Sequence, residues 1–226
     1  MELIQGDCLE IMKDMSDNSV DLLFADLPYG ATSCAWDCLI DLDLFWKQVN
    51  RVCKQDAVMA FTCSVKFGNT LINSNPKCFR YDIVWVKSAP VGFLNARKMP
   101  MKKHEMVYIF YRKLPKVYTE NINLYHTHKF IKETENKRNG KDGIDNKGMI
   151  KNRSKTEIQN KYTPPLPNNM LEIKSTRGKH STEKPVALME WILKYYSKEG
   201  DTVLDPTMGS GSTGVACVNM NRNFIG

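Results

Sequence analysis

The sequence of 226 residues contains no CxxC pair, no internal repeat and no apolar run long enough to span a bilayer. Its N-terminus, MELIQGDCLE, has none of the features of a signal peptide. The seven cysteines are scattered, and the spacing of Cys34, Cys38, His126 and His128 matches no common zinc site. These absences argue against a secreted disulfide scaffold, a membrane protein and a metal centre. We therefore expect a cytoplasmic protein with reduced thiols.

The composition is that of an ordinary globular chain, with 42% hydrophobic and 25% charged residues, which excludes a wholly disordered protein. The net charge of +7 is unevenly distributed along the sequence. Residues 113–179 hold 15 Lys and Arg against 7 Asp and Glu, whereas the rest of the chain holds 17 against 18. A basic block of this kind commonly faces a polyanion such as a nucleic acid. A solvated insert is the alternative interpretation.

The apolar pattern predicts an α/β fold with a mostly parallel sheet. Short, nearly continuous apolar runs predict strands at residues 20–26, 57–63, 82–87, 106–111, 202–205 and 223–226. Helical spacing of apolar residues predicts helices at 9–15, 41–53, 185–196 and 212–221. Residues 113–179 differ, because apolar residues are sparse there and periodicity is weak. We expect this middle segment to form an inserted lobe or long loops.

A glycine-rich turn, Gly209-Ser-Gly211-Ser-Thr-Gly214, joins a predicted strand to a predicted helix. Such a turn lets a ligand approach the backbone amides closely, although a tight turn without a ligand would have the same sequence. Val215 stands where a phosphate-binding P-loop needs lysine. The ribose-binding acid of a dinucleotide site, about 20 positions on, would fall beyond the printed sequence. S-adenosylmethionine is the third option, and Asp205 suits its cationic methionine end.

The segment Asp26-Leu27-Pro28-Tyr29 follows the first predicted strand. The Asp26 carboxylate and the Leu27 carbonyl, fixed by Pro28, could accept hydrogen bonds from the two hydrogens of an exocyclic amine and so orient its lone pair. Tyr29 offers a ring face on which a flipped-out base can stack. A simple turn after a strand is the alternative, since Asp, Pro and Gly are all common in turns.

Taken together, the motifs resemble those of the β-class DNA amino-methyltransferases, which act on adenine N6 or cytosine N4. The DPPY-type motif of that family matches Asp26–Tyr29, and its DPF-x-GSG-T loop matches Asp205–Thr213. Its H-P-T-Q-K-P element matches His180–Pro185, and Gly6-Asp7-Cys8 resembles the element whose acid contacts the cofactor adenine. The order, with the catalytic motif before the cofactor loop, is the specific part of this resemblance.

The resemblance implies a Rossmann-like methyltransferase fold, with a mostly parallel sheet, helices on both faces and a permuted motif order. Residues 1–112 and 177–226 would form the catalytic and cofactor-binding domain, and 113–176 an inserted basic target-recognition region. Asp26, Leu27, Pro28 and Tyr29 would be catalytic. The residues expected to bind S-adenosylmethionine are Asp7, Cys8, Lys184, Asp205, Pro206, Thr207, Met208, Gly209, Ser210, Gly211, Ser212 and Thr213. Arg97, Lys98, Lys102 and Lys103 would bind DNA phosphates.

The expected activity is site-specific methylation of adenine N6 in duplex DNA, by base flipping and in-line displacement, without a metal or a covalent intermediate. Asp rather than Ser at the start of the corner favours adenine over cytosine N4. An RNA amino-methyltransferase, a non-catalytic DNA-binding relative and an NAD-dependent oxidoreductase stay open as alternatives. Leu27 and Thr207 depart from the Pro and Phe that are usual in the family. The family is bacterial or phage-borne; a homodimer and a cognate restriction endonuclease are partners that the sequence leaves open.

Overall fold

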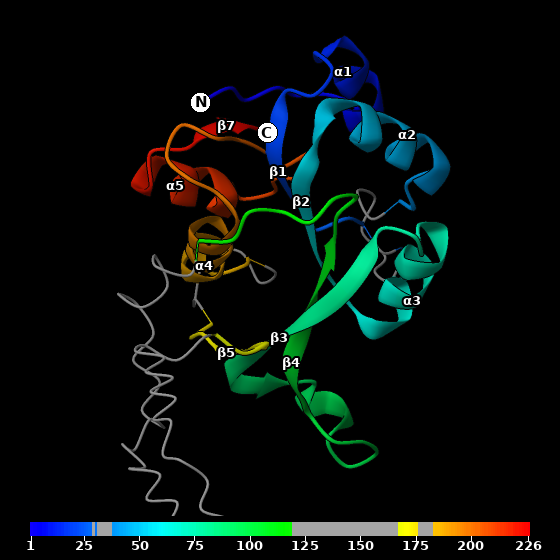
Figure 1. Cartoon of the computed structure of the whole chain (residues 1–226). Helices are drawn as coiled ribbons and strands as arrows, with labels where there is room; N and C mark the ends of the chain where they lie inside the picture. Colours follow the sequence, from blue (N-terminus) through cyan, green and yellow to red (C-terminus); the bar gives the residue numbers. More distant parts are fainter. Residues whose placement is uncertain (29, 31–37, 119–166, 176–182) are drawn as a thin grey trace, which may run out of the picture. The chain divides into compact units, whose positions relative to one another are not determined.

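The computed structural model describes residues 1–28, 30, 38–118, 167–175 and 183–226 (Figure 1). The helices are α1 (Cys8–Asp14), α2 (Leu42–Val52), α3 (Val65–Ser74), α4 (Val186–Tyr196) and α5 (Ser212–Asn219), with a short 3-10 turn, η1 (Phe93–Asn95). The strands are β1 (Val20–Ala25), β2 (Cys53–Cys63), β3 (Phe79–Val91), β4 (Lys102–Phe110), β5 (Met170–Glu172), β6 (Thr202–Leu204) and β7 (Asn223–Ile225).

The seven strands form one mixed sheet in the order β5-β3-β4-β2-β1-β6-β7. β1 runs parallel to β2 and β6, β6 to β7, and β3 to β5. Only β4 is antiparallel, to both of its neighbours, β2 and β3. The carboxyl ends of β1, β2 and β6 therefore lie at the same edge of the sheet, where open α/β sheets bind their ligands.

Alternating side chains of β1 serve two separate cores. Leu22 and Phe24 belong to the core beneath α4 and α5, whereas Leu23 and Ala25 belong to the core beneath α1, α2 and α3. Because the sheet is buried on both faces, its strands read as continuous apolar runs rather than alternating ones. The predicted α/β fold, with helices on both faces of a mostly parallel sheet, is confirmed.

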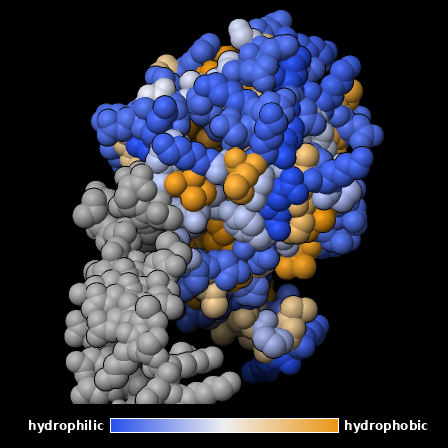
Figure 2. All heavy atoms as spheres, viewed as in Figure 1, coloured by the Kyte–Doolittle hydropathy of each residue, from blue (hydrophilic) through white to orange (hydrophobic). Residues whose placement is uncertain are grey.

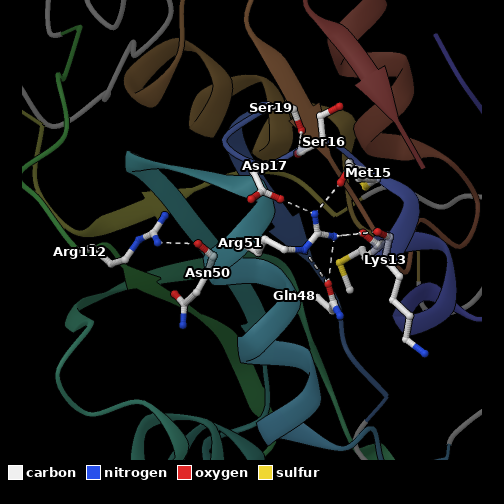
Figure 3. A network of polar contacts seen from close by, with 10 residues as sticks. Lys13, Met15, Ser16, Asp17, Ser19, Gln48, Asn50, Arg51 and Arg112 are labelled. Atoms are coloured by element: carbon white, nitrogen blue, oxygen red, sulfur yellow. Dashed lines mark hydrogen bonds and ion pairs between the residues drawn. The ribbon is translucent and has the colours of Figure 1, made fainter.

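Local sequence accounts for the starts of α2 and α3. The Asp41 carboxylate accepts hydrogen bonds from the backbone N–H groups of Asp43 and Leu44, both at 3.0 Å, so α2 starts where the sequence predicts. Ser64 caps α3 in the same way. Polar contacts join α2 to the segment after α1 (Figure 3): Arg51 Nη1 donates to the Met15 carbonyl at 2.6 Å and pairs with Asp17 at 2.6 Å.

Three elements were not predicted from the sequence: α3, η1 and β5. β5 lies inside the range 113–176 that was expected to be an insert, yet it joins the central sheet. Its Leu171 is buried and pairs with Trp85 of β3, whose indole N–H donates to the Ile173 carbonyl at 2.8 Å.

The chain divides into two compact units. One is Met1–Ile122 with Pro167–Gly226, and the other is Asn123–Leu166, which falls outside the described residues. In the described part, no helix has the length and apolar character needed to cross a membrane.

Candidate functional site

Two predicted motifs that are far apart in the sequence meet at one edge of the sheet. Leu23 of β1 lies beside Leu204 of the neighbouring parallel strand β6. Asp26 comes directly after β1 and Asp205 directly after β6. The two carboxylates are close enough to interact, because the charge of Asp26 contributes to raising the pKa of Asp205. This edge is the candidate functional site.

The Asp26 carboxylate is held by side chains from two other parts of the chain. Thr62 Oγ1, near the end of β2, donates to Asp26 Oδ1 at 2.8 Å. Lys184 Nζ, just before α4, donates to Asp26 Oδ2 at 2.6 Å. Thr62 is fully buried, the Lys184 side chain is largely buried, and the Asp26 side chain is half-buried. The orientation of the carboxylate is therefore fixed by groups outside its own turn.

Lys184 also links Asp26 to a second acid. Its Nζ lies 3.9 Å from Glu105 Oε2 on β4, and Glu105 in turn forms a close ion pair with Lys87 of β3. The four side chains Lys87, Glu105, Lys184 and Asp26 thus form a chain of alternating charge that ends at the candidate site. Alternation of this kind lets each charge be partly desolvated without leaving it uncompensated.

Of the remaining residues in the predicted catalytic corner, the Leu27 side chain is buried and belongs to the core beneath α1, α2 and α3. Pro28 is half-buried, and Tyr29 lies outside the described residues. The buried Leu27 side chain anchors a backbone position where the family usually has proline. Burial thus supplies part of the rigidity that a second proline would give.

Asp205 is buried and hydrogen-bonded within its own loop. Thr213 Oγ1 donates to Asp205 Oδ2 at 2.6 Å, and the Thr207 backbone N–H donates to Oδ1 at 3.1 Å. Burial raises the pKa of Asp205 to about 7, although these two hydrogen bonds act in the opposite direction. A cation arriving beside this carboxyl would favour its ionised form.

The loop between β6 and α5 is shaped by two glycines in the left-handed region. Gly209 has φ of +53° and Gly211 has φ of +83°, a region that glycine adopts at the lowest steric cost. The Gly211 N–H donates to the Met208 carbonyl at 2.8 Å, which closes the turn. The hydroxyl of Thr207 is buried and has no hydrogen-bond partner among the described residues. The loop therefore offers an exposed glycine backbone and one unused hydroxyl.

Asp7 and Cys8 lie near the same edge of the sheet, where the N-terminal segment leads. The N-terminal segment runs along β7, since the Glu2 N–H donates to Phe224 O and the Ile4 N–H to Gly226 O, both at 2.8 Å. Asp7 caps α1 by accepting from the Leu9 N–H at 2.8 Å. Burial raises the pKa of the half-buried Cys8 thiol, which keeps it protonated. Binding of the cofactor adenine by these two residues stays a prediction.

The remaining predicted positions fall in three groups. Pro206 and Met208 are half-buried in the glycine loop, Ser210 is exposed, and Ser212 is buried at the start of α5. Arg97, Lys98, Lys102 and Lys103 lie in and beside the connection between β3 and β4. Lys184 donates to Asp26, which adds a second role to test, and its predicted role at the cofactor stays a prediction.

Sequence reasoning missed Thr62, Glu105 and Lys87. Thr62 carried the only available signal, because it is a polar residue near the carboxyl end of an otherwise apolar run. Burial raises the thiol pKa of Cys53, Cys63 and Cys217 to about 12, so these thiols are poor nucleophiles. Among the residues that the structure describes, no cluster of His, Cys, Asp and Glu could hold a metal ion.

Comparisons with known proteins point to one family. The family model described as DNA methylase, which covers N6 and N4 methyltransferases, matches residues 20–226. The type II methyltransferase M.HinfI of Haemophilus influenzae is 25% identical over 253 residues, covering 99% of this chain and 63% of the relative. The type II methyltransferase M2.MboI of Moraxella bovis is 25% identical over 250 residues, covering 99% and 81%. The chain thus spans less than two thirds of the first relative's length.

Two solved structures share the fold. The M1.HpyAVI–SAM complex aligns with a TM-score of 0.63 and 24% identity, covering 100% of this chain and 92% of that one. The PvuII DNA methyltransferase, described as cytosine-N4-specific, aligns with a TM-score of 0.67 and 17% identity, covering 99% and 79%. Since the family model matches most of the sequence, this chain belongs to the N6/N4 DNA methylase family.

Proposed function

We propose that the protein transfers a methyl group from S-adenosylmethionine to the N6 amino group of adenine in duplex DNA. The observation that carries this proposal is the meeting of Asp26 and Asp205 at the carboxyl ends of adjacent parallel strands. One carboxylate would hold the amine that attacks, and the other would hold the cationic end of the cofactor. Membership of the DNA methylase family supports the same reaction class.

The residues of the glycine loop fit S-adenosylmethionine. The unused buried hydroxyl of Thr207 and the exposed backbone at Gly209 and Ser210 offer hydrogen bonds to an amino-acid group. Asp205 would bind its ammonium, and Asp7 would contact the adenosine. When bound, S-adenosylmethionine supplies an electrophilic methyl group. One of the structural neighbours is described as a SAM complex, which supports this assignment.

The corner after β1 would orient and activate the amine. Asp26 and the Leu27 carbonyl accept its two hydrogens, so that the nitrogen lone pair points at the methyl group. Thr62 and Lys184 keep the carboxylate in one orientation before the base arrives. Asp26 also offsets the positive charge that develops on the nitrogen during the attack. Tyr29, from the sequence motif, would stack on the flipped base.

The choice of adenine rests on the sequence motif, because Asp rather than Ser opens the corner. Cytosine N4 is the second candidate: the matching family includes both types, and one structural neighbour is described as cytosine-N4-specific. The chemistry at the nitrogen is the same in both cases. We infer the duplex partner from the basic character of residues 113–179 and from Arg97, Lys98, Lys102 and Lys103. Residues 113–176 would supply target recognition.

The test is methylation of unmethylated bacterial genomic DNA, followed by digestion and nucleoside mass spectrometry. We expect N6-methyladenine from the native protein and none from Asp26→Ala, while calorimetry gives both proteins the same affinity for S-adenosylmethionine. Asp56→Ala, at an exposed position of β2, is the matched control and should keep full activity.

Each other result has a definite meaning. Detection of N4-methylcytosine would change the target base from adenine to cytosine and leave the proposed mechanism intact. Substantial activity in Asp26→Ala would overturn the proposed site. Tyr29→Phe should have a mild effect and Tyr29→Ala a severe one, because stacking needs the ring and not the hydroxyl. Equal rates for these two variants would remove stacking from the mechanism.

A further inference from the structure

The connection between β3 and β4 carries apolar side chains out into solvent. Every residue from 88 to 101, here called the hairpin tip, is exposed. Leu94 is 96% exposed and Phe93 80%, and Met99 in the same tip is also exposed. Figure 2 shows apolar and hydrophilic residues side by side at the lower end of the molecule, where Figure 1 places this connection. Large apolar side chains gathered at a protruding turn usually mark a binding surface.

The tip is a defined turn with its own backbone hydrogen bonds. Gly92, with φ of +93°, opens the 3-10 turn η1, and the Asn95 N–H donates to the Gly92 carbonyl at 3.0 Å. The Ala96 N–H donates to the Phe93 carbonyl and the Met99 N–H to the Asn95 carbonyl, both at 3.0 Å. Phe93 and Leu94 therefore protrude from a preformed turn, which lowers the entropy lost when they become buried.

The charged side chains around the tip are all basic. Residues 88–104 contain Arg97, Lys98, Lys102 and Lys103 and no aspartate or glutamate. Across the described ranges, none of these four cations has a carboxylate partner. Charge complementarity therefore favours a polyanion. A polyanion that also accepts apolar side chains is a nucleic-acid duplex, with phosphates outside and stacked bases within.

The tip lies beyond the edge of the sheet that holds the candidate site. β4 leads from the tip at Lys102 to Glu105, and Glu105 reaches Asp26 through Lys184. Lys102 lies three positions before Glu105, and three steps along an extended strand span about 10 Å. A duplex lying against the site would therefore lie within reach of the tip.

We propose that Phe93 and Leu94 form an apolar wedge that enters the base stack of the duplex beside the target base. The wedge occupies space that the target base leaves when it moves to Asp26, and the four flanking cations hold the neighbouring phosphates. This inference rests on the proposed function, and it adds a part that drives base flipping. Apolar side chains inserted between base steps are a known way to unstack a duplex.

The test compares two substrates that differ only in the cost of flipping. The recognition sequence is first read by methylation-sensitive sequencing of undigested genomic DNA that the native protein has methylated. Two oligonucleotide duplexes then carry it, one with a normal pair and one with a mismatch at the target base. Unstacking a mismatched base costs less, so it needs the wedge less. Val218→Ala is the matched control, because Val218 is 58% exposed and lies near the carboxyl end of α5, away from the glycine loop.

For Phe93→Ala, Leu94→Ala and the double variant, we expect the methylation rate on the paired duplex to fall by about ten- to a hundredfold. On the mismatched duplex the same variants should stay within about threefold of the native rate, as should Val218→Ala on both duplexes. Equal losses on both duplexes, or no loss on either, would overturn the wedge. A change in the oligomeric state of the variants would overturn the wedge and indicate that the tip is a contact between two copies of this chain. An inactive native protein would overturn the proposed function itself, which separates the two failures.

Discussion

Lys184 Nζ lies 2.6 Å from Asp26 Oδ2, and the other oxygen of the same carboxylate accepts a hydrogen bond from Thr62 at 2.8 Å. The two donors come from the segment before α4 and from the end of β2. An ionised carboxylate has about four lone-pair sites, so these two donors leave it able in principle to accept a hydrogen bond from an amine as well. Lys184 and Thr62 are therefore positioning residues for Asp26 in the proposed reaction.

Thr62→Val should lower kcat by about ten- to a hundredfold, because a charge-assisted hydrogen bond that orients the carboxylate is lost. The affinity for S-adenosylmethionine and the KM for DNA should stay nearly unchanged. Thr62→Ser keeps the hydroxyl and should recover most of the rate. Steady-state kinetics would measure kcat and KM, and calorimetry would measure the affinity for S-adenosylmethionine. Equal rates for the Val and Ser variants would show that the hydroxyl does not orient Asp26.

Lys184→Met should also lower kcat, because Asp26 and Glu105 lose the cation between them. The matched control is Lys54→Met: Lys54 pairs with Asp21 at the same distance of 2.6 Å, at the opposite end of β1. Because that pair lies away from the candidate site, its loss should have little effect on the rate. If Lys184→Met instead weakened cofactor binding and left kcat intact, Lys184 would have the cofactor role that its sequence motif predicts.

The binding of S-adenosylmethionine should strengthen as the pH rises from 5.5 to 7.5. Burial raises the pKa of Asp205 to about 7, so the carboxyl is largely neutral below that pH and attracts a cationic ligand less. Affinity should rise by about tenfold over this range and then level off, while the ligand's amino group is still protonated. Calorimetry in buffers of different ionisation enthalpy should also detect release of a proton on binding.

Asp205→Asn is the control for this pH dependence, and it should bind weakly and with a flat profile. A sloping profile in this variant would assign the titration to another group. For the unliganded protein, the contribution of Asp205 to folding stability depends on pH in the opposite direction. Because the pKa of Asp205 is raised from 3.8, the folded state binds more protons than the unfolded state between about pH 4 and pH 7, so this group's contribution to stability falls as the pH rises.

The sequence was sufficient to place Asp26 and Asp205 directly after strands, because each follows a strongly apolar run, and strand ends at a parallel sheet edge converge. Their roles in the reaction stay predictions. The sequence was not sufficient for Thr62 and Glu105. Their roles depend on cross-strand register, in which Phe61 lies beside Ala25 and Glu105 beside Trp85. Register of this kind is set by the whole sheet, and no local pattern encodes it.

The missed elements have particular causes. α3 carries Gly68 in its middle, which weakens the helical signal because glycine disfavours helices. β5 has three residues, of which only Leu171 is buried, so it offers no periodicity to detect. Its place in the sheet comes from pairing with β3, far away in the sequence. The insert predicted at 113–176 therefore contained a sheet strand that composition could not reveal.

Thr207→Val should weaken S-adenosylmethionine binding by about tenfold without destabilising the unliganded protein. The Thr207 hydroxyl is buried without a partner among the described residues, so removing it should even raise the free energy of unfolding by about 1 kcal/mol. Ser175→Ala is the matched control, since the Ser175 hydroxyl is also buried without a described partner. It should share any gain in stability but leave ligand affinity unchanged. Unaltered binding in Thr207→Val would exclude this hydroxyl from the cofactor site.

Gly68→Ala should destabilise the protein by about 1–3 kcal/mol, although alanine normally favours a helix. A Cβ at this position of α3 would lie 2.6 Å from Cζ and 2.7 Å from the hydroxyl oxygen of Tyr108, whose ring is buried. Asn69→Ala, at the exposed next position, should be neutral or stabilising and is the control. In a Tyr108→Leu background, which removes the distal ring atoms, the cost of Gly68→Ala should shrink or reverse. Chemical denaturation of the four proteins gives this coupling directly. An unchanged cost in both backgrounds would mean that the helix, and not the ring, requires glycine.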